Sequence, residues 1–157
     1  MYHDRPPRIG PMQLWRLSTR LYRAGHYRSA KVLKGVSFVL FRAILPPEVE
    51  LGRDVRLEHY GFGVVIHPNT TLGDRCRIYH GVTLGSSASI GSADRIVVGT
   101  DVLVGAGAVV VNRIGSTLHI GDRARLGANC VVVGDVPPDA SVLAPLGTVV
   151  SRTGGAR

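Results

Sequence analysis

Large aliphatic residues recur every six positions over most of this 157-residue chain, and glycine often follows them directly. Helix faces recur every three or four residues and strand faces every two, so neither element alone produces a period of six. A coil with three flat sides and a turn at each corner does, because its inward side chains stack in ladders. The sequence therefore predicts an all-β core, a parallel β-helix over residues 45–143. The recurring residues are Leu45, Leu51, Leu57, Ile66, Leu72, Ile78, Leu84, Ile90 and Ile96, then Val98, Val104 and Val110, and finally Ile120, Leu126 and Val132.

The side chains available for this core are small. Hydrophobic residues make up 45% of the chain but aromatic residues only 6%. A small side chain stands four positions after most of the large ones, and Cys76 and Cys130 both occupy this second inward position. Two cysteines are too few for a disulfide framework, so we expect both to be thiols that fill the core.

The positive charge of the chain is confined to its N-terminal part. Residues 1–44 carry nine basic residues and one acid, whereas residues 45–157 are electrically balanced. A pI near 10.3 often indicates nucleic-acid binding, but here the charge belongs to an appendage and predicts no nucleic-acid partner. The N-terminus lacks the apolar region of a secretory signal, and the apolar stretch 36–45 is far shorter than the ~20 residues that span a bilayer. These features predict a cytoplasmic protein.

We expect a disordered tail at 1–11, a basic helical segment at 12–44, the β-helix domain at 45–143 and a C-terminal tail at 144–157. Met12 is a second candidate start. Two apolar stripes in the helical segment favour a cap over the open end of the β-helix. The same basic amphipathic pattern also fits a peripheral contact with anionic membranes. The stripes are Leu14, Leu17, Leu21 and Tyr22, and, after a break near Gly25 and His26, Ala30, Leu33, Val36, Val39 and Leu40.

Function often lies where a regular pattern is interrupted. The interval from Leu57 to Ile66 is nine residues instead of six, so residues 58–62 are predicted to bulge outward and expose His59. A neutral imidazole at such a place suits the role of general base. His80 occupies an outward position one turn later, and turns stack ~4.8 Å apart, so it is a candidate for the same cleft.

Four segments carry a resemblance to a known family: LEHYGFGVVI at 57–66, GVTLG at 81–85, VGAGA at 104–108 and DVPP at 135–138. With the six-residue period, they make the chain resemble the left-handed β-helix acyltransferases, most closely the serine O-acetyltransferases and their shorter relatives. The resemblance implies acetyl-CoA as co-substrate, serine or a serine-like amino acid as acceptor, and a homotrimer with active sites between neighbouring subunits. The alternatives are a sugar O-acetyltransferase in polysaccharide or natural-product biosynthesis and a catalytically silent β-helix scaffold.

The resemblance also assigns roles around the acceptor. His59 matches the family's general base, and Glu58 and Arg95 stand where family members bind the amino-acid substrate. The alternative for both charges is plain solvation, which an arginine in an exposed loop favours. Ile44 replaces the family's orienting aspartate, and Ile96 replaces a second active-site histidine. The candidates to orient the base instead are Glu48, Glu50 and a backbone carbonyl.

Coenzyme A is expected to lie along corners that lack side chains, where its pantetheine arm can approach the backbone. By position, the backbone N–H of Ser86, after Gly85, would form an oxyanion contact, and Arg123 or Arg125 would meet the nucleotide phosphates. The small corner residues are Gly105, Ala106, Gly127 and Ala128. No metal is predicted, because the histidines lack the five-residue spacing of zinc-binding β-helix carbonic anhydrases. These histidines are His59, His67, His80 and His119, of which His67 and His119 are expected to be structural.

Overall fold

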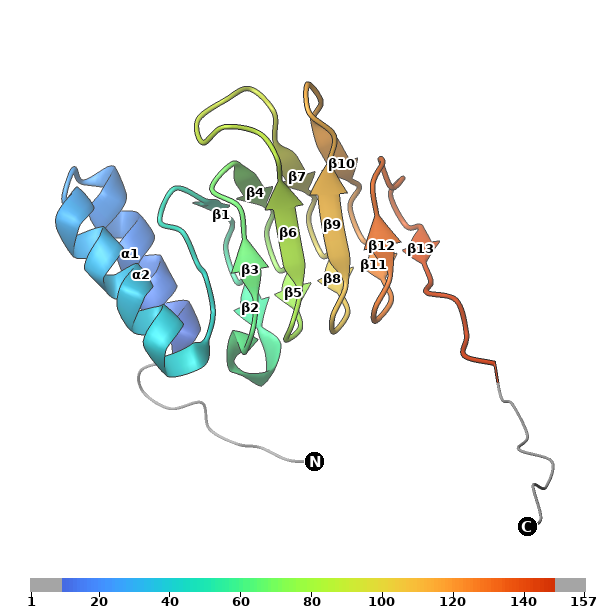
Figure 1. Cartoon of the computed structure of the whole chain (residues 1–157), viewed down its shortest axis with the longest axis horizontal. Helices are drawn as coiled ribbons and strands as arrows, with labels where there is room; N and C mark the ends of the chain where they lie inside the picture. Colours follow the sequence, from blue (N-terminus) through green and yellow to red (C-terminus); the bar gives the residue numbers. More distant parts are fainter. Residues whose placement is uncertain (1–9, 149–157) are drawn as a thin grey trace, which may run out of the picture.

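The computed structural model describes residues 10–148, so most of the predicted tails at 1–11 and 144–157 lies outside the described residues. Two helices, α1 (Pro11–Arg23) and α2 (Tyr27–Phe41), precede a long series of short strands (Figure 1). The strands are β1 (Glu50–Leu51), β2 (Arg56–Leu57), β3 (Val65–Ile66), β4 (Thr70–Leu72), β5 (Arg77–Ile78), β6 (Thr83–Ser86), β7 (Ile96–Val98), β8 (Leu103–Val104), β9 (Val109–Asn112), β10 (Leu118–Ile120), β11 (Arg125–Leu126), β12 (Val131–Val132) and β13 (Ser141–Val142).

The strands form three parallel sheets, which are the three faces of the coil. The first face has the order β1-β4-β7-β10, the second β2-β5-β8-β11-β13 and the third β3-β6-β9-β12. Because the chain visits the three faces in the same order in each turn, the molecule is a parallel β-helix, as the period of six predicts. The first corner joins the first face to the second, the second corner joins the second face to the third, and the third corner leads into the next turn.

The interior follows the predicted ladder with one exception. Leu72 and Leu84 are almost completely buried, but Ile90 is 67% exposed. Residues 87–95 form a loop at the third corner between β6 and β7, and the strand register pairs Leu72 with Val98. The prediction for Ile90 was wrong because Ile90 lies in this loop. It is nevertheless six residues from both Leu84 and Ile96, so the period alone does not reveal the loop.

Asn69 ties this loop to the preceding turn. Its Nδ2 donates to the carbonyl oxygens of Ser89 and Asp94 over 2.9 and 3.1 Å, and its Oδ1 accepts from the backbone N–H of Gly91 over 2.8 Å. Asn69 is itself buried, so these bonds satisfy an amide that would otherwise be costly inside the protein. The loop is therefore held against the third corner, next to the residues that precede β7.

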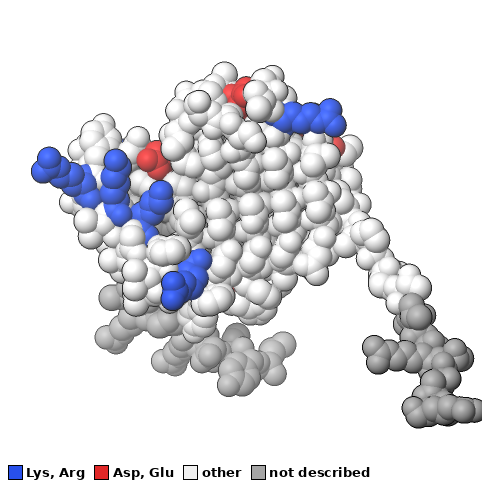
Figure 2. Space-filling model, viewed as in Figure 1, with Lys and Arg blue, Asp and Glu red and all other residues white. Residues whose placement is uncertain are grey.

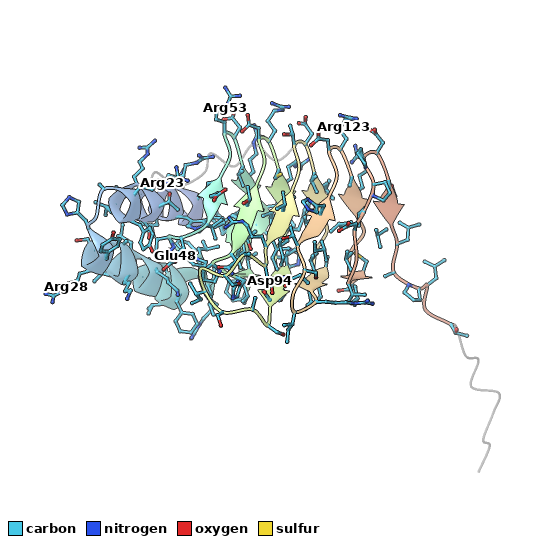
Figure 3. All side chains as sticks on the ribbon, turned by 90° about the horizontal axis from the view of Figure 1, so that it is seen from above. Arg23, Arg28, Glu48, Arg53, Asp94 and Arg123 are labelled. Carbon is cyan, nitrogen blue, oxygen red and sulfur yellow. The ribbon has the colours of Figure 1, made fainter. Side chains whose placement is uncertain are left out.

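Charge pairs join successive turns at the first corner. Arg53 projects from the same edge of the β-helix as Arg123, as Figure 3 shows. Each arginine at this corner donates to an aspartate of the following turn, so the guanidinium groups bridge the coil along its length. The pairs are Arg53–Asp74, Arg75–Asp101 and Arg123–Asp139.

Close backbone contact also sets the spacing at this corner. A Cβ atom on Gly52 would lie 2.5 Å from the carbonyl carbon of Gly73, and one on Gly73 would lie 2.5 Å from that of Gly99. No side chain fits into such a gap, so glycine is required where one turn rests on the next. We call Gly52, Gly73, Gly99 and Gly121 the glycine column.

Helix α1 lies against the N-terminal end of the β-helix (Figure 1) and covers its open core. Trp15 is fully buried, and its Nε1 donates to the carbonyl oxygen of Pro46 over 2.9 Å. The predicted α1 stripe was wrong at Leu17, which is 46% exposed, whereas the other three residues of the stripe are half-buried and Ser18, outside it, is buried. Burial of Ser18 is inexpensive because its hydroxyl donates to the carbonyl oxygen of Ala30 over 2.9 Å.

Helix α2 packs on α1 through one side only. Ala30 and Ser37 are buried, whereas Val39 and Leu40 of the predicted second stripe are 69% and 62% exposed. The predicted cap is therefore built mainly by α1, and an apolar side of α2 faces outward. Within residues 10–148, neither helix combines the length and hydrophobicity that crossing a membrane requires.

Candidate active site

The extra residues between Leu57 and Ile66 form a short 3-10 helix at the second corner, η1 (Glu58–Gly61). His59 and Tyr60 both have left-handed backbone angles, with φ of 50° and 58°. This conformation costs free energy in residues other than glycine, and such strain clusters at functional sites. The side chain of His59 is exposed on this bulge, in the position that the sequence predicts.

The turn that follows brings His80 to the same corner. The Nδ1 atoms of His59 and His80 are 2.9 Å apart, within hydrogen-bond distance, and their ring centroids are 4.9 Å apart. Tyr79 meets the ring of His59 edge to face, with centroids 5.6 Å apart. Two imidazole nitrogens at this distance share one proton, because one must donate while the other accepts.

Glu58 is engaged by a residue that the sequence analysis did not single out. Its Oε1 accepts a 2.8 Å hydrogen bond from Nε of Arg77, and Arg77 also donates to the hydroxyl of Tyr79 over 3.3 Å. The hydrogen bond to this carboxylate raises the pKa of the Arg77 guanidinium. The outward charge of Glu58 is therefore largely balanced within the chain.

Among the described residues, no carboxylate lies within hydrogen-bond distance of His59. Ile44 forms a β-bridge with Val65, and Glu50, in β1 on the first face, is bonded to Thr71 and Arg95. Neither glutamate that was a candidate orienting group, Glu48 or Glu50, therefore bonds to the imidazole. The partner of the ring is His80.

Small residues continue from His80 along the second corner. Gly105 and Ala106 follow one turn later, and Gly127 and Ala128 follow in the turn after that. The turns are joined by backbone bonds from Gly107 to the His80 carbonyl and from Asn129 to the Ala106 carbonyl, 3.0 and 2.8 Å long. Within residues 10–148 the backbone N–H groups of Ala106 and Ala128 make no hydrogen bond, so they are available to a ligand.

The remaining predicted contacts lie at the third corner, across the third face from His59. Gly85 and Ser86 end β6, where the Ser86 hydroxyl accepts from the backbone N–H of Ala88 over 3.0 Å. Arg95 precedes β7 and donates to Glu50 over 3.1 Å and to Thr71 over 2.8 Å. Within one chain, the fold does not bring these residues to His59. Figure 1 shows this separation, with the bulge of η1 and the long loop before β7 on opposite edges.

The two candidate phosphate ligands differ in their surroundings. Arg123 is held by Asp139 through two hydrogen bonds of 2.6 and 2.7 Å at the first corner. We call Gly105, Ala106, Gly127 and Ala128 the strip of small residues. Arg125 is exposed on the second face, in β11, two residues before Gly127 of this strip. Arg125 is thus the better placed of the two to meet a ligand along that strip.

The other histidines have separate environments. Nδ1 of His67 accepts from the backbone N–H of Asn69 over 3.1 Å, and partial burial lowers the pKa of this imidazole. His119 is exposed on the first face. Within the described part of the chain, no three histidine, cysteine, aspartate or glutamate residues are grouped as a metal site.

Arg77 and Tyr79 are the neighbours of the site that sequence reasoning missed. The available signal was the turn length, since β2 and β5 pair Arg56 with Arg77 and so place residues about 21 positions apart side by side. Applied to Glu58 and His59, that spacing leads to Tyr79 and His80. Their side-chain contacts, however, depend on rotamers that the period does not specify.

Comparisons with known proteins agree with this architecture. No family model matches the chain. It is 32% identical to a serine acetyltransferase of Helicobacter pylori over 146 residues, which is 93% of this chain and 82% of that protein. It is 37% identical to a serine acetyltransferase of Mycobacterium tuberculosis over 140 residues, which is 89% of this chain but only 56% of that protein.

Solved structures give the same result. The serine acetyltransferase of Neisseria gonorrhoeae in complex with serine superposes with a TM-score of 0.76 at 33% identity, covering 86% of this chain and 53% of that one. The Brucella abortus serine acetyltransferase in complex with coenzyme A superposes with a TM-score of 0.77 at 26% identity, covering 97% and 64%. The chain thus spans about half the length of several proteins that it matches.

Proposed function

Because the chain belongs to the serine acetyltransferase family, we propose that it transfers the acetyl group of acetyl-CoA to the hydroxyl of a small acceptor, serine or a serine-like amino acid. One observation carries this proposal. The exposed imidazole of His59 lies at the head of the strip of small residues, where an acyl donor and a hydroxyl can meet. The reaction is proposed for the cytoplasm.

His59 acts as the general base. Its Nε2 takes the proton of the acceptor hydroxyl while that oxygen bonds to the thioester carbonyl carbon. The carbon–sulfur bond then breaks, and the departing sulfur takes the proton back from Nε2. The products are an acetyl ester and the free thiol of coenzyme A, so no other reactant is needed.

The strip supports a binding path for coenzyme A. Ala106, Gly127 and Ala128 present backbone without bulky side chains, and the two alanine N–H groups are free to bond the amides of the pantetheine arm. Gly105 is buried beneath the next turn, so it permits the close stacking of these corners and does not itself face the ligand. Arg125, exposed beside the strip, is the proposed partner of a nucleotide phosphate.

We propose a homotrimer in which the third faces pack together. Strands β3, β6, β9 and β12 contain no charged residue, and Figure 2 shows this face free of blue and red side chains. Val131 on this face is 65% exposed in the single chain, which is typical of a surface that a partner covers.

This packing would complete the active site. His59 lies on one edge of the third face, and Ser86 and Arg95 lie on the other edge. Around a threefold axis, opposite edges of neighbouring copies meet. The backbone N–H of Ser86 from one copy would then serve as the oxyanion donor, and Arg95 as an acceptor contact, for His59 of the next.

One observation favours a second candidate acceptor, a sugar hydroxyl. Glu58 and Arg95, which would hold the ammonium and carboxylate of an amino acid, are both ion-paired within the chain, to Arg77 and Glu50. A neutral sugar requires neither charge. Under this candidate the chemistry at His59 is unchanged, and only the acceptor differs.

We also propose that α2 touches anionic lipid surfaces. Residues 10–42 contain seven basic residues and no acid, and the blue side chains in Figure 2 gather over the two helices. Val32, Val36, Val39 and Leu40 line an apolar groove on the outer side of α2. Because a second copy would bring the same positive charge, the complementary partner is an anionic membrane.

The proposed activity is tested by release of free thiol from acetyl-CoA with serine, homoserine, and neutral and amino sugars as acceptors. We expect turnover with at least one acceptor, reduced at least ~100-fold in His59→Ala, as loss of a general base predicts. His119→Ala is the matched control and should be unaffected. No turnover across the panel and no binding of acetyl-CoA would leave the scaffold alternative.

A further inference from the structure

We propose that His80 positions His59 for catalysis by accepting the proton on its Nδ1, in the place where a carboxylate would otherwise orient the base. This inference rests on the proposed function of His59. The observation behind it is the 2.9 Å separation of the two Nδ1 atoms, which makes the rings direct hydrogen-bond partners.

The chemistry fixes the direction of this bond. A base that accepts a proton at Nε2 must carry its own proton on Nδ1, so His59 donates and Nδ1 of His80 accepts. His80 then holds its own proton on Nε2. When His59 takes the proton of the acceptor hydroxyl, the imidazolium that forms keeps its Nδ1–H bonded to His80, and the total number of protons is conserved.

The groups around the pair are consistent with this assignment. Glu58 lies beside His59 in sequence, but its Oε1 is bonded to Arg77, and the ion pair leaves the neighbourhood close to neutral. Tyr79 presents its ring to His59 edge to face, and the hydroxyl of Tyr79 accepts from Arg77. Within residues 10–148, His59 makes its side-chain hydrogen bond to His80.

The backbone fixes the position of each histidine, and so the distance between the two rings. His59 is carried by η1, whose left-handed residues turn the bulge back toward the coil. The main chain of His80 is fixed because its carbonyl oxygen accepts a 3.0 Å bond from Gly107 in the next turn. Since this bond uses the backbone, substitutions of the His80 side chain should leave the corner folded.

The experiment compares His80→Phe, which removes the acceptor, with His80→Gln, which keeps an oxygen able to accept. We expect His80→Phe to lower kcat by about 10- to 100-fold, as loss of a partner that orients a histidine typically does. His80→Gln should recover a substantial part of that loss. His119→Phe, at an exposed histidine on the first face, is the matched control and should behave as wild type.

A second measurement detects the hydrogen bond between His59 and His80 without requiring turnover. In wild type, nitrogen-15 NMR of labelled histidine should show His59 as the tautomer protonated at Nδ1, and in His80→Phe that tautomer should lose its preference. This readout remains informative if no acceptor is turned over, so failure of the proposed function and failure of this inference are distinguishable.

Four results would overturn the inference. The first is wild-type kcat in His80→Phe, and the second is an unchanged tautomer of His59 in that variant. The third is loss of wild-type activity on treatment with a chelator, since two facing imidazoles are also ligands for a metal ion. Equal loss in His80→Gln and His80→Phe would likewise count against an acceptor role.

Discussion

Arg75 and Asp101 occupy the same corner in successive turns of the β-helix, both with φ of 58°, and two hydrogen bonds of 2.7 and 2.6 Å join their side chains. The same ion pairing is made by Arg53 with Asp74 and by Arg123 with Asp139, and the last two residues also share a φ of 60°. In each pair the arginine holds the pKa of the aspartate below its usual range. The corner is therefore stabilised by ionised carboxylates.

These pairs predict a defined loss of stability in acid. A carboxyl group whose pKa is lowered by folding stabilises the protein above its unfolded pKa of about 3.8, and that contribution disappears as the pH falls through the lower, folded value. Urea unfolding midpoints between about pH 6 and pH 2 should fall more in wild type than in the triple variant Asp74→Asn, Asp101→Asn, Asp139→Asn. Parallel curves would contradict a role of these pairs in acid stability.

The thiols should be unreactive in the folded protein. Cys76 and Cys130 are buried, as predicted, and burial raises the pKa of Cys76 to about 11. Since the thiolate is the reactive form, alkylation with iodoacetamide at about pH 8 should label neither cysteine in native protein and both in urea. The Cys76 thiol donates to the carbonyl oxygen of Gly99 over 3.0 Å, so rapid labelling of Cys76 under native conditions would show that this corner opens readily.

The apolar third face predicts a trimer. Light scattering should give a mass about three times 16.8 kDa for wild type. Val131→Glu should reduce it to the monomer because it buries an unpaired charge at the interface. His119→Glu, an exposed change on the first face, should leave the mass unchanged. A monomeric wild type would contradict the proposed packing.

A site shared between subunits makes a further prediction. His59→Ala and Arg95→Ala each remove a residue from a different edge of the third face, so each variant alone should be impaired. Trimers assembled from an equal mixture should contain intact sites at about a quarter of their interfaces and recover about a quarter of wild-type activity. Recovery no greater than the average of the two variants would place both residues in one subunit's site, or Arg95 outside it.

Arg77 should influence the choice of acceptor. Arg77→Gln releases Glu58, whose carboxylate then attracts an ammonium group, so KM for serine should fall by up to ~5-fold while KM for neutral sugars stays the same. The control is Arg56→Gln, an exposed arginine one turn earlier on the same face. An identical change for both acceptors would show that Glu58 does not contact the ammonium group.

Vesicle sedimentation tests the lipid contact. Binding should occur to vesicles that contain phosphatidylglycerol, weaken with salt, and be lost in Val36→Glu combined with Val39→Glu. Ile114→Glu, which changes an exposed aliphatic residue in the loop between β9 and β10, should bind as wild type. Equal binding to neutral vesicles would refute the role of charge, and dimerisation through α2 would reveal a second copy as the partner.

The sequence predicted those features that packing repeats in every turn. The aliphatic ladder and the bulge at His59 were both recoverable, because an interior position imposes the same demand each time and an interruption of the count is visible. Ile90 was misassigned because the loop at 87–95 keeps that count by chance. The burial of Trp15 and Ser18 in α1 was missed because both make hydrogen bonds that a hydrophobic stripe does not reveal. The contact of His59 with His80 depends on rotamers and on strained backbone, which no periodicity encodes.

The glycine column at the first corner also affects the two histidines at the second corner. His59 and His80 belong to the same two turns as Gly52 and Gly73, so the distance between the imidazoles is inherited from how closely those turns lie. A methyl group at Gly52 would push these two turns apart at the first corner, and the tilt that it causes would separate the rings at the second corner. Glycines that have no side chain, and that lie at a different corner from the site, thus set the distance over which His59 and His80 share a proton.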